Sequence, residues 1–121
     1  MPTVLLVEDD PDIREASGII LRREGYEVVE AEHGEQALEA LAQMREPPCL
    51  VLLDLMMPVM TGPELLKVLQ DRQQLADLTV VVLSAGGQPK DAPQAKHFLR
   101  KPVPASLLVA IVREFCAAPR S

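Results

Sequence analysis

The sequence predicts a single α/β domain whose parallel β-sheet is covered by helices on both faces. Its 121 residues fall within the usual size of one domain. Short apolar runs alternate along the chain with segments whose apolar residues recur at the helical period. No hairpin turn separates successive strands, so each helix must carry the chain back to start a parallel neighbour. We therefore expect one doubly wound domain over residues 1–121.

The first strand and helix are marked by their composition and end residues. Residues 3–7 form an uninterrupted apolar run that ends in acids, which is typical of a strand buried on both faces. Asp10 then precedes Pro11, and Pro is tolerated at the first position of a helix because its missing N–H has no partner there. Gly25 is expected to end this helix, since glycine readily adopts the conformation that follows a helix C-terminus.

The same alternation continues to the C-terminal end. We expect further strands over 26–31, 50–54, 78–84 and 98–100, and further helices over 35–45, 63–72 and 104–116. Between Ser84 and Phe98 the chain has two glycines and two prolines, which disfavour a full helix. This segment is expected to form a loop, or at most one or two helical turns.

Composition limits the classes of function. The chain has 12 basic and 18 acidic residues, a net charge of −6, which argues against direct nucleic-acid binding. No apolar run reaches the 18 or more residues of a membrane span, and the N-terminus does not resemble a signal peptide. Cys49 and Cys116 have no metal-ligand spacing, and we expect them to be buried free thiols in the reducing cytoplasm.

Polar residues capable of catalysis or metal binding lie at the carboxyl ends of four of the predicted strands. They are Glu8, Asp9, Asp54, Ser84 and Lys101. The carboxyl ends of parallel strands lie at one edge of the sheet, where function collects in this class of fold. Clustered carboxylates need raised pKa values or a bound cation, and Mg²⁺ prefers oxygen ligands. A carboxylate nucleophile with Mg²⁺, a lysine and a hydroxyl is the set required for phosphoryl transfer to aspartate.

Four segments in this order resemble the receiver domain of two-component response regulators, the CheY-like family. They are Val-Leu-Leu-Val-Glu-Asp-Asp at 4–10, Asp-Leu-Met-Met-Pro-Val-Met-Thr-Gly at 54–62, Val-Leu-Ser-Ala at 82–85 and Phe-Leu-Arg-Lys-Pro at 98–102. The resemblance covers essentially the whole chain. It implies a flavodoxin-like, five-stranded sheet with strand order 2-1-3-4-5.

The resemblance also assigns the metal and the phosphoryl group. Asp54 would accept a phosphoryl group from a sensor histidine kinase or a phosphotransfer protein. Glu8, Asp9, Asp54 and the backbone carbonyl of Met56 would hold Mg²⁺, with Glu8 acting through water. Asp10 could be taken for another ligand, but an acid before a helix proline is more typical of an N-cap.

Three further roles follow from the same resemblance. Ser84 and Lys101 would hold phosphoryl oxygens, and Phe98 matches the aromatic residue that turns inward when the hydroxyl at Ser84 moves. The bond between Lys101 and Pro102 would be cis. The modified domain would be read by a downstream effector protein.

One departure from the family leaves an alternative open. The segment between Ser84 and Phe98 is several residues shorter than in the family, where it forms the fourth helix of the output and dimerisation face. We therefore expect a monomer or a weak dimer. The alternative function is a pseudo-receiver, an interaction module that signals without phosphorylation. In either case we expect no turnover of an external substrate, so the domain is not an enzyme.

Overall fold

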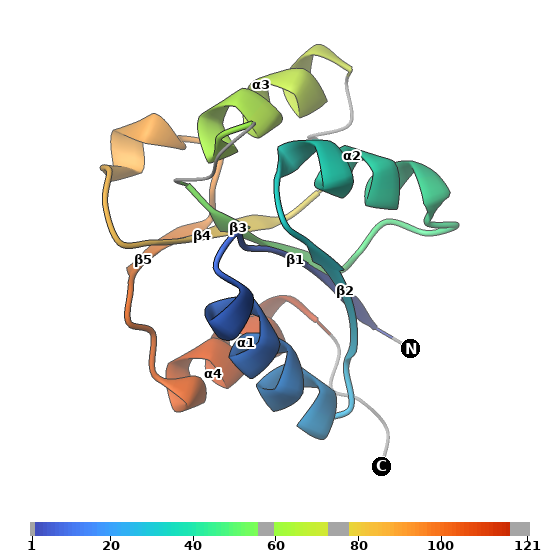
Figure 1. The fold of residues 1–121 in the computed structure, drawn as a ribbon, viewed down its shortest axis with the longest axis vertical. Helices are drawn as coiled ribbons and strands as arrows, with labels where there is room; N and C mark the ends of the chain where they lie inside the picture. Colours follow the sequence, from blue (N-terminus) through green and yellow to red (C-terminus); the bar gives the residue numbers. More distant parts are fainter. Residues whose placement is uncertain (1, 56–59, 73–77, 117–121) are drawn as a thin grey trace.

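The computed structural model describes residues 2–55, 60–72 and 78–116, which form a parallel five-stranded sheet between two layers of helices (Figure 1). The sheet order is β2-β1-β3-β4-β5, and every neighbouring pair is parallel. In chain order the elements are β1 (Thr3–Val7), α1 (Pro11–Arg23), β2 (Glu27–Ala31), α2 (Gly34–Gln43), β3 (Leu50–Asp54), α3 (Gly62–Asp71), β4 (Val80–Ser84), η2 (Pro89–Asp91), β5 (His97–Arg100) and α4 (Ala105–Phe115). The predicted fold class and strand order are confirmed.

The two faces of the sheet carry separate cores. Side chains of alternate strand residues pack against α2 and α3 on one face and against α1 and α4 on the other (Figure 1). Every residue of β3 and β4 is buried, which explains why these strands read as continuous apolar runs. The interior of the described part is built mainly from Leu and Val, with some Ala, and burial of apolar side chains is the main favourable contribution to folding.

Local signals fix where the helices begin. The Asp10 carboxylate accepts hydrogen bonds from the N–H groups of Asp12 and Ile13, and Pro11 occupies the first turn of α1. Asp10 is therefore an N-cap, as its position before proline predicts. Before α3, Thr61 and Glu64 form a reciprocal capping box. The observed bounds of the elements lie within two residues of the predicted ones.

The segment between β4 and β5 forms no full helix. It contains only the short 3₁₀-helix η2, which confirms the prediction made from its glycines and prolines. Ala92 is buried and Ala95 is partly buried, and both pack into the core on the α2–α3 side of the sheet. This short segment therefore covers part of the sheet face where the family resemblance implies a helix.

The prediction of two free thiols is wrong. Cys49 and Cys116 form a disulfide with a Cα–Cα distance of 5.3 Å, across a sequence separation of 67 residues. Cys49 directly precedes β3 and Cys116 directly follows α4, which places both at the sheet edge opposite the carboxyl ends of the strands. Their proximity results from α4 running antiparallel to the strands, which no local spacing of cysteines indicates.

None of the helices in the three described ranges is long and apolar enough to cross a membrane.

Candidate functional site

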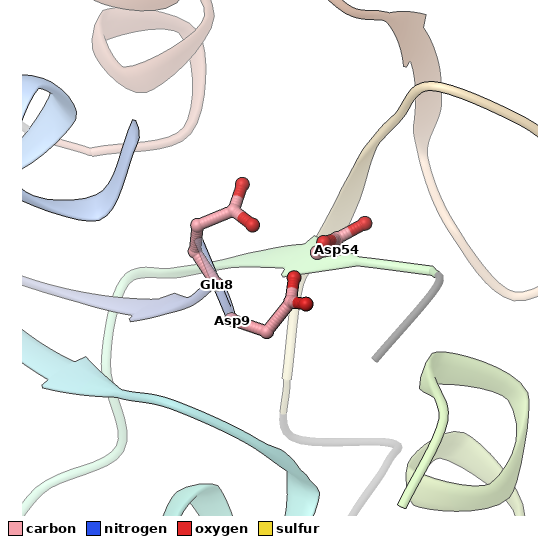
Figure 2. Close-up of side chains that lie close together, drawn as sticks. All are labelled: Glu8, Asp9 and Asp54. Atoms are coloured by element: carbon pink, nitrogen blue, oxygen red, sulfur yellow. The ribbon is translucent and has the colours of Figure 1, made fainter. Parts of the chain in front are cut away.

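Three carboxylates gather at the carboxyl ends of the adjacent strands β1 and β3 (Figure 2). Glu8 and Asp9 follow β1 directly, and Asp54 is the last residue of β3. One oxygen from each carboxylate lies within 4.8 Å of the others. Parallel pairing of β1 with β3 brings these residues together, because it places both strand ends at the same edge.

Lys101 supplies positive charge to this cluster. Its ammonium group pairs with the Glu8 carboxylate and lies 3.4 Å from Oδ2 of Asp54. The Glu8 and Asp54 side chains are only 3% and 6% exposed, and that of Lys101 is 14% exposed. Lys101 directly follows β5 and precedes Pro102 across a cis peptide bond, as the resemblance implies. Buried charges of opposite sign thus offset part of each other's desolvation.

The protonation of the cluster is strongly perturbed. Burial, together with hydrogen bonding to Asp9 and Glu8 and the charge of Glu8, raises the pKa of Asp54 to about 7. Burial opposes ionisation of Asp9 as well, but its hydrogen bonds to Asp54 and Glu8 outweigh this effect and lower its pKa. Burial would also lower the pKa of Lys101, yet its contacts with Glu8 and Asp54 raise it. The cluster therefore holds a proton up to a higher pH than separate carboxylates would.

Ser84 lies at the same sheet edge, at the end of β4. The neighbouring strands β3 and β4 pair Asp54 with Leu83, the residue before Ser84. The Ser84 side chain is fully buried, and its Oγ accepts the Gly86 N–H at 3.2 Å. The Ser84 carbonyl accepts the Lys101 N–H at 3.0 Å, which ties the fifth strand's end to the fourth. Ser84 and Lys101 are thus brought to the edge that carries the carboxylates.

Phe98 is half-buried on β5. Its side chain packs against the core on the α2–α3 side of the sheet, and the Arg100 guanidinium lies 5.0 Å from its ring centroid. Met56, expected to contribute a backbone carbonyl, lies outside the described residues. Of the residues predicted to form the site, the structure therefore gathers Glu8, Asp9, Asp54 and Lys101, with Ser84 on the adjacent strand.

The carboxylate cluster fits a hard divalent cation. Its ligands are oxygens, and no cysteine or histidine belongs to the described cluster. Burial and, after it, the neighbouring carboxylates of Asp9 and Glu8 raise the pKa of Asp54, and the positive charge of a cation at this position would act in the opposite direction. The residues present therefore match Mg²⁺ in donor type and in charge.

Sequence reasoning did not identify Arg14. Its guanidinium donates a hydrogen bond to the Glu8 backbone carbonyl at 2.7 Å, directly beside the cluster. One signal was available: Arg14 lies at the fourth position of α1, at the helix end where the backbone dipole disfavours a cation.

Comparisons with known proteins agree with this arrangement. The family model of the response regulator receiver domain matches residues 4–113. The phosphate regulon transcriptional regulatory protein PhoB of Klebsiella pneumoniae is 34% identical over 91% of this chain and 49% of its own length. RpaA of Synechocystis, a DNA-binding dual master transcriptional regulator, is 36% identical over 93% of this chain and 48% of its own length. The chain thus spans about half the length of these curated relatives.

Solved structures of response regulators are also similar to this chain in fold. The chemotaxis response regulator CheY4 of Vibrio cholerae has a TM-score of 0.82 and 28% identity, and the match covers 95% of this chain and 98% of that chain. The response regulator TrrA of Thermotoga maritima was solved in complex with Mg²⁺-BeF. It has a TM-score of 0.81 and 28% identity to this chain, and the match covers 95% of this chain and 99% of TrrA. With a family model matched over most of its length and an acidic cluster at the expected strand ends, the chain belongs to the response regulator receiver domain family.

Proposed function

We propose that this domain is a phospho-acceptor switch in which Asp54 receives a phosphoryl group from a histidine kinase or a phosphotransfer protein. The observation that carries the proposal is the position of Asp54: its carboxylate lies among those of Glu8 and Asp9 and 3.4 Å from the Lys101 ammonium. Burying the carboxylates of Glu8 and Asp54 reduces the stability of the fold, and a function at this site accounts for their presence. TrrA, solved with Mg²⁺-BeF, is a relative of similar fold.

The chemistry requires an ionised, well-oriented nucleophile. A carboxylate oxygen of Asp54 forms a bond to phosphorus while the bond from phosphorus to the donor imidazole nitrogen breaks. The bonding electrons stay on that nitrogen, which takes up a proton. Lys101 compensates charge on the phosphoryl oxygens, and Ser84 offers a hydroxyl donor to one of them.

Glu8, Asp9 and Asp54 would hold Mg²⁺, which when bound neutralises their charge and that of the incoming phosphoryl oxygens. Glu8 and Lys101 already form an ion pair, so their side chains are held at the edge of the site before any ligand arrives. Lys101 also keeps part of the negative charge offset, which favours the ionised form of Asp54.

The signal is a change in conformation that a downstream effector protein distinguishes. Ser84 Oγ accepts a hydrogen bond from the Gly86 N–H, so movement of this hydroxyl toward a phosphoryl oxygen would have to break that bond. The Phe98 ring is in contact with the Arg100 guanidinium, which would have to move if Phe98 turned inward. We propose that the domain turns over no external substrate, acts in the cytoplasm, and is a monomer or weak dimer. The excess of acidic residues argues against direct contact with nucleic acid.

Intact-mass spectrometry after incubation with acetyl phosphate tests this function. We expect one Mg²⁺-dependent phosphoryl adduct on the wild-type protein and none on Asp54→Asn. Asp12→Asn is the matched control, because it removes an exposed acid near the same sheet edge but outside the cluster. It should be phosphorylated as the wild type is.

The absence of any adduct from several phosphodonors would overturn the proposal. The domain would then be a pseudo-receiver that is read in its unmodified state. The short segment between β4 and β5 favours that alternative, since it changes the face that the family uses for output.

A further inference from the structure

The side chain of Arg14 joins three segments beside the acidic cluster. Its Nη1 donates to the Glu8 carbonyl at 2.7 Å, while its Nε and Nη2 lie 3.6 Å from the carboxylates of Glu30 and Glu32. The side chain is only 15% exposed. Thus α1 supplies the guanidinium, the end of β2 and the residue that follows it supply two carboxylates, and the turn after β1 supplies the carbonyl.

The start of α1 is an unfavourable position for a positively charged side chain that has no other contacts. Arg14 lies near the N-terminus of α1, where the partial positive charge of the helix repels it. Arg22, near the C-terminus of the same helix, makes a comparable pair of contacts: a hydrogen bond to the Val28 carbonyl at 3.1 Å and an ion pair with Glu30 at 2.8 Å. Of these two arginines of α1, Arg14 is the one that reaches the turn carrying the carboxylates.

Both the backbone and the side chain of Glu8, in the turn after β1, make contacts that fix its position. The Glu8 N–H donates to the Ala31 carbonyl at 3.0 Å, and its carboxylate accepts the Asp10 N–H at 3.2 Å and pairs with Lys101. The Glu8 carbonyl belongs to the peptide group that joins Glu8 to Asp9. Its orientation therefore sets the directions in which both carboxylates leave the backbone.

We propose that Arg14 is a positioning residue for the divalent cation site, which acts by locking the peptide group between Glu8 and Asp9. This inference rests on the proposed function, because it concerns the same carboxylates. Glu30 and Glu32 hold the guanidinium in place, so contacts of Arg14 connect the end of β2 to the turn that carries the carboxylates. Arg14 would act through this peptide group, without itself being a ligand of the cation or of the phosphoryl group.

Geometry and charge make opposite predictions for loss of the side chain. If Arg14 acted only through its charge, its removal would leave the carboxylates more negative and strengthen Mg²⁺ binding. If it acts by positioning, both Arg14→Gln and Arg14→Lys weaken binding, because lysine keeps the charge but lacks the planar set of donors that contacts Glu8, Glu30 and Glu32 at once.

Isothermal titration calorimetry with MgCl₂ measures this directly. We expect the Kd for Mg²⁺ to rise about 10-fold in Arg14→Gln and Arg14→Lys, the lower end of the effect of outer-shell partners of metal ligands. Arg22→Gln is the matched control, since it removes a carbonyl contact and an ion pair with Glu30 on the same helix without touching Glu8. Its Kd should match that of the wild type.

Phosphorylation by acetyl phosphate supplies a second readout. In the Arg14 variants the Mg²⁺ concentration that gives half the maximal rate should rise about 10-fold, while the rate at saturating Mg²⁺ stays near that of the wild type. Should Arg14→Gln fail to fold by circular dichroism, Glu32→Gln loosens the same guanidinium and should raise the Kd by a smaller factor.

Unchanged or tighter Mg²⁺ binding in both Arg14 variants would overturn the inference, as would equal weakening in Arg22→Gln. Failure of the proposed function looks different. In that case the wild-type protein binds Mg²⁺ with the expected dependence on Arg14 but gains no phosphoryl group.

Discussion

Reduction of the disulfide between Cys49 and Cys116 should remove a large part of the stability of the domain. The bond closes a loop across a sequence separation of 67 residues. In the chain-entropy description, cross-links over loops of about 15 and about 100 residues stabilise by about 3 and about 4.7 kcal/mol, so about 4 kcal/mol is expected here. Domains are typically stable by only about 5–15 kcal/mol.

Urea unfolding followed by far-UV circular dichroism, with and without a phosphine reductant, measures this contribution. Comparing one protein in two redox states leaves both sulfur atoms in place, so no cavity is created at Cys116, which is 3% exposed. With a typical urea dependence of about 1–3 kcal/mol per molar, the midpoint should fall by more than about 1 M on reduction. The variant with both cysteines replaced by alanine should not respond to the reductant.

The reasoning would be refuted if the midpoint stayed the same after thiol labelling had shown both cysteines to be reduced. Loss of the cross-link would then carry no entropic effect on the unfolded chain. A reductant-sensitive midpoint in the double alanine variant would point instead to an effect of the reductant unrelated to these cysteines.

Two further predictions concern the charges of the site. In EDTA, Asp54→Asn should raise the free energy of unfolding by up to about 4 kcal/mol at pH 8. Burial raises the pKa of Asp54 from its ordinary 3.8 to about 7, so ionisation of this group destabilises the folded state progressively as the pH rises between these values. The gain should therefore be smaller at pH 5, and equal gains at both pH values would contradict this cause. Lys101→Met should lower the free energy of unfolding at pH 8 by about 3 kcal/mol, because it leaves Glu8 and Asp54 buried without their cation. Urea titrations measure this loss, and it should diminish at pH 5; a loss that does not depend on pH would indicate a packing effect.

Local features of the sequence were sufficient to predict the elements and to place the acidic residues at strand ends. The acid and proline at Asp10 and Pro11 mark the start of α1, and continuous apolar runs mark the buried strands. Two glycines and two prolines correctly predicted that no full helix joins β4 to β5. These signals act over a few residues, through backbone dihedrals, capping hydrogen bonds and the period of apolar residues, so they can be recognised without knowledge of the fold.

Other features depend on where distant elements meet in space. The disulfide joins residues 67 positions apart because α4 ends beside the start of β3. The prediction of free thiols rests on a reducing cytoplasm and on the lack of a cysteine framework, and nothing near either cysteine indicates its partner. Arg14 meets Glu8, Glu30 and Glu32 only because α1 packs over the end of β2 with a particular face toward it.

The pKa of Asp54 also depends on contacts between residues that are distant in the sequence. Its position at a strand end was predictable from the chain, but its pKa of about 7 results from burial and from the carboxylates of Asp9 and Glu8. Backbone preferences are properties of short segments, whereas desolvation and charge interactions are set by every group within a few ångströms, whatever its distance along the chain. Only the packed tertiary structure brings those groups together.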